Sequence, residues 1–229
     1  MTTTRHPEMR VQRLAIGREG APLLVVDNAV GNSADLVELA ATKVFAMSPN
    51  FYPGMRAKAP LTYQKFILET LRPEIDAAFG LAGPTLRFSE CNFSLVTTPG
   101  ENLSYLQRIP HIDSFVNEEL AMIHYLFHAD HGGTAFYRHR ATGYEYVDFG
   151  RETDYLNHIA LEKAGPNSAP AAYINGDTPL YERIGSQDGV FNRLLMYRRT
   201  SLHSACIAPG FFPDPNPRTG RLSINGFIA

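Results

Sequence analysis

The stretch Leu120-Ala-Met-Ile-His-Tyr-Leu-Phe-His-Ala-Asp-His-Gly-Gly-Thr-Ala-Phe-Tyr-Arg-His139 carries the pattern that decides the fold. It contains two runs, 120–128 and 134–139, that are rich in aromatic and β-branched residues, and Gly132-Gly133 lies between them. Such runs, when glycine separates them, are typical of neighbouring strands joined by a turn. The stretch therefore predicts two strands, at 120–128 and 134–139.

Similar runs lie on both sides of this stretch and alternate with Gly, Pro and Asn. This spacing favours an all-β sandwich or barrel over alternating βαβ units. One helix, from about Glu152 to Lys163, interrupts the strands. The further predicted strands are 86–97, 103–109, 191–198, 203–208 and 221–228.

The N-terminal third has a different character. A short strand is expected at Leu23–Asp27, and apolar residues at helical spacing predict a helix over Ser33–Met47. A second helix is expected over Tyr63–Phe79, with Pro73 inside it and Gly80 at its end. We therefore predict a β-rich α+β fold in a single domain, in which strand and helical support (residues 1–83) packs against a β-barrel or jelly-roll core (residues 84–229).

The composition is that of an ordinary globular protein, with 44% hydrophobic and 19% charged residues. The formal net charge of −2 gives no reason to expect a nucleic-acid partner, because nucleic-acid-binding proteins usually have a basic face. The two cysteines, Cys91 and Cys206, have no CxxC spacing, which disfavours a thiolate zinc site. No run approaches the roughly 18 apolar residues of a membrane span. We expect a cytoplasmic protein without a membrane partner.

His111-Ile112-Asp113 is a candidate metal-binding motif. In an extended segment, residues i and i+2 point to the same face, so this imidazole and carboxylate can bind one ion. Fe(II) in oxygenases takes two imidazoles and one carboxylate on one face and keeps other positions open. His203 is the candidate for the second imidazole. Taken alone, the tripeptide also fits a surface histidine beside an aspartate.

Arg221-Leu-Ser223 is a candidate carboxylate-binding motif near the end of the chain. On a strand Arg221 and Ser223 share a face, while Leu222 and Ile224 occupy the other. A guanidinium binds a carboxylate through two hydrogen bonds, and a nearby hydroxyl can bind the same group. The distal carboxylate of a dicarboxylic keto acid would suit this pair. The alternative is a solvated face on which Arg221 pairs with Asp214.

The order of these motifs resembles the 2-oxoglutarate/Fe(II)-dependent oxygenase superfamily, and most closely its prolyl-hydroxylase-like branch. The elements that carry the resemblance are His111-x-Asp113, Tyr125-Leu126, Gly132-Gly133-Thr134, His203 and Gly220-Arg221-Leu-Ser223, within about residues 86–228. The resemblance implies a double-stranded β-helix, a cupin-like jelly roll whose mouth holds the metal. It also implies an oxidoreductase that hydroxylates its substrate and releases succinate and CO2.

The resemblance assigns a role to each motif. His111, Asp113 and His203 would bind Fe(II), and no catalytic residue beyond these ligands is expected. Arg221 would bind the remote carboxylate of 2-oxoglutarate, with hydroxyl groups from Ser223 and Tyr125 beside it. Because related halogenases replace the carboxylate ligand with a small residue, Asp113 favours hydroxylation or desaturation.

Two segments depart from the family pattern. The chain between His203 and Arg221 is lengthened by 208–220, which we expect to form a proline-stiffened loop. The insert at about 140–189 is longer than a strand connection needs, and long insertions are usually lids or interaction surfaces. We expect this insert to overhang the barrel mouth, and a dimer contact or simple packing is the open alternative.

The cluster His124, His128 and His131 would resemble a zinc site only on a helix. On the predicted strand His124 and His128 face away from Tyr125, so we expect outer-face residues that bind no metal. His139 and His158 are candidates to line the substrate cavity.

Two other functions share parts of this pattern. A cupin-type metalloenzyme that uses no 2-oxoglutarate would need the three ligands but not Arg221. A non-catalytic binding barrel would need neither the three metal ligands nor Arg221. Under the oxygenase interpretation the partner is a small-molecule or peptide/protein substrate, and we expect a homodimer.

Overall fold

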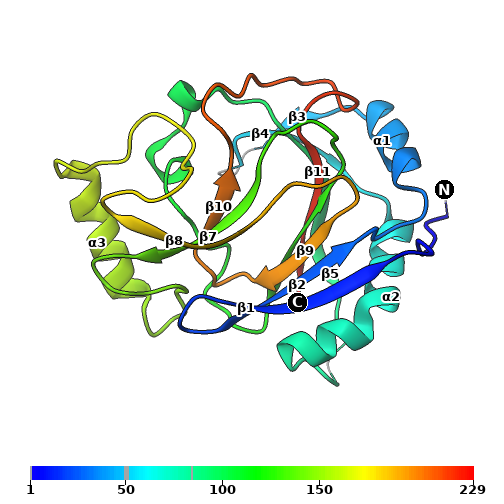
Figure 1. Cartoon of the computed structure of the whole chain (residues 1–229), viewed down its shortest axis with the longest axis horizontal. Helices are drawn as coiled ribbons and strands as arrows, with labels where there is room; N and C mark the ends of the chain where they lie inside the picture. Colours follow the sequence, from blue (N-terminus) through cyan, green and yellow to red (C-terminus); the bar gives the residue numbers. More distant parts are fainter. Residues whose placement is uncertain (1, 49–51, 84) are drawn as a thin grey trace.

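The computed structural model describes residues 2–48, 52–83 and 85–229. Its strands form an eight-stranded sheet and a three-stranded sheet, and every strand pairing within them is antiparallel (Figure 1). The predicted sheet-rich α+β class is confirmed. The expected boundary at residues 83 and 84 lies partly outside the described residues, which omit residue 84.

The large sheet contains strands from both halves of the chain. The two sheets face each other across an apolar layer, described below. In spatial order the large sheet consists of β1 (Arg10–Ile16), β2 (Ala21–Asp27), β9 (Leu194–Arg198), β6 (Leu120–Tyr125), β11 (Leu222–Ile228), β5 (Phe88–Val96), β4 (Gly54–Lys58) and β3 (Ala46–Met47), and the small sheet of β10 (His203–Cys206), β7 (Gly133–His139) and β8 (Tyr181–Gln187).

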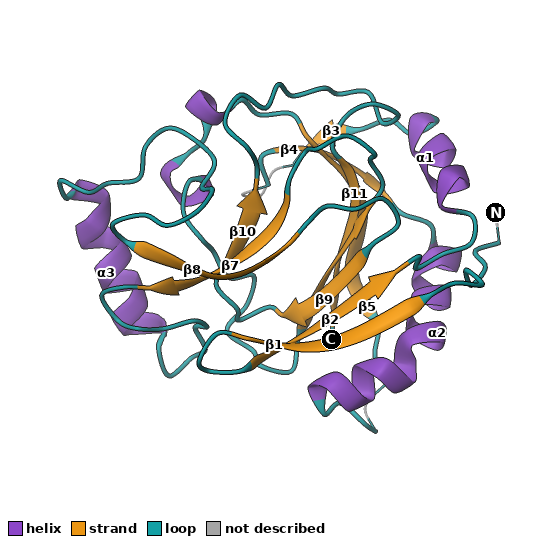
Figure 2. Ribbon diagram, viewed as in Figure 1, coloured by secondary structure: helices purple, strands orange, loops and turns teal. Residues whose placement is uncertain are grey.

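Helices cover the outer faces of both sheets. Figure 2 shows α1 (Ser33–Ala41) and α2 (Leu61–Phe79) beside the large sheet and α3 (Glu152–Ala164) beside the small one. Every fourth residue of α2 is buried, from Tyr63 to Phe79, so one face of the helix packs on the sheet. The helix continues through Pro73 and ends at Gly80, whose φ of 68° suits glycine.

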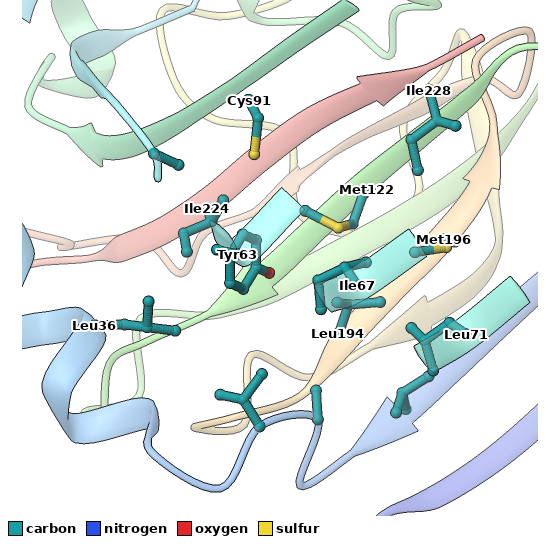
Figure 3. Close-up of a cluster of buried hydrophobic side chains, with 14 of the residues drawn as sticks. Leu36, Tyr63, Ile67, Leu71, Cys91, Met122, Leu194, Met196, Ile224 and Ile228 are labelled. Atoms are coloured by element: carbon teal, nitrogen blue, oxygen red, sulfur yellow. The ribbon is translucent and has the colours of Figure 1, made fainter. Parts of the chain in front are cut away.

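Three apolar clusters lie between these layers. The outer cluster, between α1, α2 and the large sheet, contains Phe93. It also contains Ile67 and Ile224, which Figure 3 labels. The middle cluster, between the two sheets, contains Tyr125, Phe136 and Tyr197. A third cluster packs α3 against the small sheet. Leu222 and Ile224 both belong to the outer cluster, so the predicted face of β11 that carries them is confirmed.

Several sequence predictions need correction. Residues 103–109 form no strand. They contain the 3-10 helix η2 (Tyr105–Gln107), because Ser104 and Gln107 form a capping box that favours a helical turn. A further 3-10 helix, η1 (Gly100–Asn102), precedes it. The helix predicted over 33–47 ends at Ala41, because Ala46–Met47 pairs with β4 instead. The prediction also missed β1, at one edge of the large sheet, and β4 and β3, at the other.

The region 140–189 differs in part from the expected insert. It contains α3, as predicted, but its last residues form β8, which pairs with β7 along the edge of the small sheet. This region therefore supplies an edge strand of the small sheet, β8, as well as the helix that packs on that sheet, α3. None of the helices in the described part of the chain has the length and apolar content required to cross a membrane.

His124 is buried on the face of β6 opposite Tyr125, beneath α2. Its Nε2–H donates to the Asn192 carboxamide oxygen (3.1 Å), and its Nδ1 accepts the Tyr63 hydroxyl (3.0 Å). Burial lowers the pKa of His124 from 6.5 to about 4, a shift that the bond to Asn192 partly opposes. The folded protein therefore holds this histidine neutral.

The buried neutral His124 predicts an acid-sensitive stability. Between pH 6.5 and 4 the unfolded chain protonates this histidine and the folded chain does not, so the free energy of unfolding falls as the pH falls through this window, by about 3 kcal/mol in total. Urea unfolding as a function of pH should show a smaller slope for His124→Gln than for the wild type. His128→Gln, at an exposed position, should keep the wild-type slope. An unchanged slope in His124→Gln would contradict this assignment.

Candidate metal centre and carboxylate site

Two distant segments meet at the candidate metal centre. His111 and His203 form an antiparallel bridge in which each backbone N–H donates to the other residue's carbonyl, at 2.9 and 3.0 Å. This pairing sets the two imidazoles side by side, with ring centroids 4.4 Å apart. The tertiary structure thus joins the predicted tripeptide to the predicted distal histidine.

Asp113 completes the cluster. Its carboxylate oxygens lie 3.9 Å from His111 Nε2 and 3.5 Å from His203 Nε2, and one donor atom from each residue lies within 4.8 Å of the other two. The Asp113 backbone N–H donates to the Arg199 carbonyl (2.8 Å), and the Arg199 side chain donates to the Asp113 carbonyl (2.7 Å). These bonds fix the backbone from which the Asp113 carboxylate extends. Two imidazoles and a carboxylate are a suitable donor set for a divalent iron.

Both imidazoles are prepared to act as ligands. His203 Nδ1–H donates to the Ser201 carbonyl (2.9 Å), which leaves the Nε2 lone pair facing Asp113. Although 47% of the His111 side chain is exposed, the surrounding protein desolvates its ring and, together with His203, lowers its pKa to about 4 against the opposing effect of Asp113. Neutral imidazole is the form that binds a metal ion.

Arg221 packs against Tyr125 and Phe127 of the middle cluster, whereas the His203 ring contacts Tyr197 of the same cluster. Arg221 is 2% exposed, and its guanidinium lies over the rings of Tyr125 and Phe127, at 5.9 and 5.5 Å from their centroids. Its Nε and one terminal nitrogen donate to the carbonyls of His131 and Gly133, both at 2.9 Å. No carboxylate among the described residues pairs with it. The alternative of a solvated Arg221–Asp214 pair is therefore wrong.

The two predicted hydroxyl groups lie on neighbouring strands. Ser223 is opposite Tyr125 in the register of β11 and β6, and both side chains are fully buried. The Tyr125 hydroxyl bonds the Thr134 hydroxyl (2.6 Å), and the Ser223 hydroxyl donates to Asn225 (2.7 Å). Burial raises the pKa of Tyr125 to about 12, a shift that Arg221 partly opposes, so its phenol stays protonated.

The remaining histidines lie away from this centre. His128 stacks on Phe191, with centroids 3.9 Å apart, and His131 contacts Phe127 and Phe211. His139 is buried against α3, where Nε2 bonds Glu162 (2.7 Å), and His158 lies near Asp154 on the same helix. His139 thus packs against α3, and His158 is part of that helix.

Sequence reasoning missed three residues around the site. Arg199 holds the backbone of Asp113, Thr134 bonds Tyr125, and the Tyr197 ring lies 4.7 Å from that of His203. Thr134 directly follows the glycine pair that was recognised as a turn. Arg199 and Tyr197 had no comparable signal, because their contacts join segments that are far apart in the chain.

The chain resembles several solved structures at low sequence identity. One similar structure is the non-heme alpha ketoglutarate dependent epimerase SnoN from nogalamycin biosynthesis, with 14% identity and a TM-score of 0.45 over 86% of this chain and 70% of that one. Another is HygX from Streptomyces hygroscopicus, solved with nickel, 2-oxoglutarate and hygromycin B, with 11% identity and a TM-score of 0.49 over 90% and 82%. No curated protein matches the chain by sequence.

A family model matches nearly the whole length of the chain. The match runs over residues 7–228 and includes every candidate site residue described above. The model is described as DUF6445, a family of unknown function. The chain therefore belongs to the DUF6445 family.

Proposed function

We propose that this protein is a non-haem iron(II) and 2-oxoglutarate-dependent oxygenase. It would hydroxylate a small molecule or a side chain of a peptide or protein, with release of succinate and CO2. The observation that carries the proposal is the unpaired buried guanidinium of Arg221, which faces the same apolar layer as a His-Asp-His cluster. The order of motifs along the chain supports a place in the prolyl-hydroxylase-like branch.

The strand connections support a double-stranded β-helix. From β5 onward the chain places β5 in the large sheet, His111 beside β10 in the small one, and then β6 in the large sheet. It continues with β7 and β8 in the small sheet, β9 in the large, β10 in the small and β11 in the large. This alternation between facing sheets is that of a jelly roll. In such a fold the metal site lies between the sheets.

The donor set fits iron(II). His111, Asp113 and His203 would hold the metal from one side, which leaves room for the keto and carboxylate oxygens of 2-oxoglutarate and for O2. When bound, the iron and the keto acid supply the oxidising chemistry. The protein fixes the three ligands through the His111–His203 backbone pair and the Arg199 contacts.

Arg221 fits the far carboxylate of the keto acid. A buried cation is costly when it lacks an anionic partner, and backbone carbonyls compensate it only in part. A carboxylate bound between Arg221 and the hydroxyl groups near it would complete the pairing. A cupin-type enzyme without a keto acid has no use for this cation, so Arg221 favours the oxygenase over that alternative.

Removing Arg221 should weaken keto-acid binding and leave metal binding intact. Two charge-assisted hydrogen bonds are lost, so Arg221→Ala should need about a hundredfold more 2-oxoglutarate for half-saturation. The measurement is an anaerobic titration of the Fe(II)-loaded protein, following the visible charge-transfer band of the chelate. Arg218→Ala is the matched control, because Arg218 is exposed and pairs with Glu38.

The same titration tests the function as a whole. The wild type should bind Fe(II) and develop the band when 2-oxoglutarate is added. Iron binding without a band at any keto-acid concentration would support the cupin alternative. A protein that binds no iron would refute both metalloenzyme interpretations.

A further inference from the structure

The inner face of the large sheet, which is turned toward the small sheet, changes from apolar to polar at β11. The middle cluster covers this face over β2, β9 and β6 and reaches β11 through Phe227, but it contains no residue of β5 or β4. Phe93 in β5 and Ala57 in β4 belong to the outer cluster, so their neighbours along each strand face inward. These inward-facing residues form a polar strip, which consists of Arg56, Glu90, Asn92, Ser94, Ser223 and Asn225.

One end of the polar strip lies beside the candidate carboxylate site. Ser94 is opposite Arg56 on one side and opposite Ser223 on the other. Ser223 is two residues from Arg221 along the chain. Because neighbouring strands are about 4.8 Å apart, the backbone of Arg56 lies about 10 Å from that of Ser223. A long side chain on β4 can therefore reach the space beside Arg221.

The other end of the polar strip lies toward the candidate metal centre. Glu90 is opposite Phe227 in the register of β5 and β11. The guanidinium of Arg199 lies over the Phe227 ring, at 4.1 Å from its centroid, and the same side chain donates to the Asp113 carbonyl. The polar strip thus runs alongside the two parts of the proposed site, and it offers hydrogen-bonding groups where the middle cluster offers none.

Arg56 is the cation of the polar strip, and its guanidinium is held in a fixed orientation. Its Nη1 donates to Glu90 Oε1 (2.9 Å), and the guanidinium packs on the Tyr52 ring, 4.4 Å from the centroid. Nε is buried without an acceptor among the described residues, and Nη2 makes no hydrogen bond to them either. The Nε–H and Nη2–H groups lie side by side and form the fork that binds a carboxylate through two hydrogen bonds.

Arg193 shows how this fork is filled elsewhere in the protein. The Arg193 side chain is 18% exposed and that of Arg56 is 16% exposed. Arg193 Nε and Nη2 donate to the two carboxylate oxygens of Asp27, at 2.6 and 3.1 Å. An unfilled fork at similar burial leaves a donor desolvated without compensation. A carboxylate from outside the chain would give Arg56 the pairing that Arg193 already has.

The charges around Arg56 favour a ligand with one negative charge. Lys58, which is exposed and lies opposite Asn92, adds a second cation that attracts an anion. The Glu90 carboxylate is bonded to the same guanidinium and repels any anion placed there. This repulsion is greater for a dianion such as phosphate than for a carboxylate. The partial exposure of Arg56 and Glu90 (28%) opens this end of the polar strip to solvent, whereas Asn92 is 5% exposed.

We propose that the polar strip binds the substrate of the enzyme and that the Nε and Nη2 groups of Arg56 bind a carboxylate of this substrate. The inference rests on the function proposed above and gives the class of its substrate, which is a polar molecule carrying a carboxylate. The keto acid takes Arg221, and the substrate carboxylate takes Arg56 beside it. Glu90 is a positioning residue, because it holds the guanidinium with the fork free.

The test follows the Arg56 Nε–H group by proton–nitrogen NMR of the full chain. The protein is loaded with Zn(II), a diamagnetic substitute for Fe(II), and saturated with 2-oxoglutarate. It is then titrated with propanoate, with propanamide and, at mildly alkaline pH, with inorganic phosphate, which is mainly a dianion there. The Arg193 Nε–H group is the matched control within the same sample, because Asp27 already fills its fork. Arg56→Lys and Arg193→Lys assign the two signals.

We expect propanoate to shift the Arg56 signal and to saturate at about 1–10 mM, as befits a small anion bound by one fork. Propanamide should leave the signal in place, phosphate should bind more weakly than propanoate, and the Arg193 signal should stay still throughout. Arg56→Lys keeps the charge and lacks the fork. Its propanoate affinity, followed at the Asn92 carboxamide, should be about tenfold lower.

The failures are distinguishable. An Arg56 signal that propanoate leaves in place, or that propanamide moves equally, would overturn this inference. A signal moved by 2-oxoglutarate and then insensitive to propanoate would assign Arg56 to the keto acid and overturn the substrate assignment. Tighter binding of phosphate than of propanoate would overturn the carboxylate class. A protein that binds propanoate at Arg56 but neither Zn(II) nor 2-oxoglutarate would overturn the proposed function and leave the carboxylate site at Arg56 standing.

Discussion

His203→Ala should lower the affinity for Fe(II) by more than about a hundredfold and abolish turnover of 2-oxoglutarate. Removal of the outer partners of metal ligands already costs about 10–100-fold in affinity, so loss of a ligand itself should cost more. The backbone pair with His111 needs no side chain, so the strand pairing should survive the change. Anaerobic equilibrium dialysis with Fe(II) measures the affinity directly.

His128→Ala is the control for this experiment. His128 is exposed, stacks on Phe191 and is not one of the three clustered donors. It should bind Fe(II) like the wild type, and circular dichroism should report the same fold for both variants. If His203→Ala retained wild-type affinity, His203 would not be a ligand and the proposed metal centre would be wrong.

Phe93→Ala should produce the largest loss of stability among single changes away from the site. Phe93 is fully buried in the outer cluster on β5, and its strand partners are Ile224 in β11 and Ala57 in β4. Truncating a buried phenylalanine costs about 3–5 kcal/mol through lost burial and the cavity left behind. For a chain of this size the melting temperature should fall by about 10 °C.

An exposed phenylalanine supplies the control. Phe212 is 86% exposed, so Phe212→Ala should change the free energy of unfolding by less than about 0.5 kcal/mol. Phe93 faces the helices, on the other side of the large sheet from the metal centre, so Phe93→Ala should still bind Fe(II) below its melting temperature. A loss of under about 1 kcal/mol would show that the outer cluster is not tightly packed.

Much of the fold was predictable from local patterns. Period-two alternation predicted that Leu222 and Ile224 lie on one face of β11, and the outer cluster contains both. The helix expected over Tyr63–Phe79 is α2, which ends before Gly80 as predicted. These features depend on neighbours within one element, which a single sequence displays directly.

Errors arose where a capping box or the pairing with a following strand overrode composition. Residues 103–109 have the composition of a strand, but the Ser104–Gln107 capping box makes a helical turn there. Ala46–Met47 leaves the predicted helix because β4 pairs with it. The partner strand begins at Gly54, outside the segment whose apolar spacing predicted the helix, so that spacing alone does not indicate the pairing.

The sequence by itself determined which residue types could form the site. His111 and Asp113 share a face because of their i, i+2 spacing, and Arg221 and Ser223 do so for the same reason. The tertiary structure alone decided that His203 pairs with His111 and that Arg221 is buried without an acidic partner among the described residues. The physical reason is that strand alternation is set within each segment, whereas register, burial and pairing of charges are set by how the two sheets close on each other.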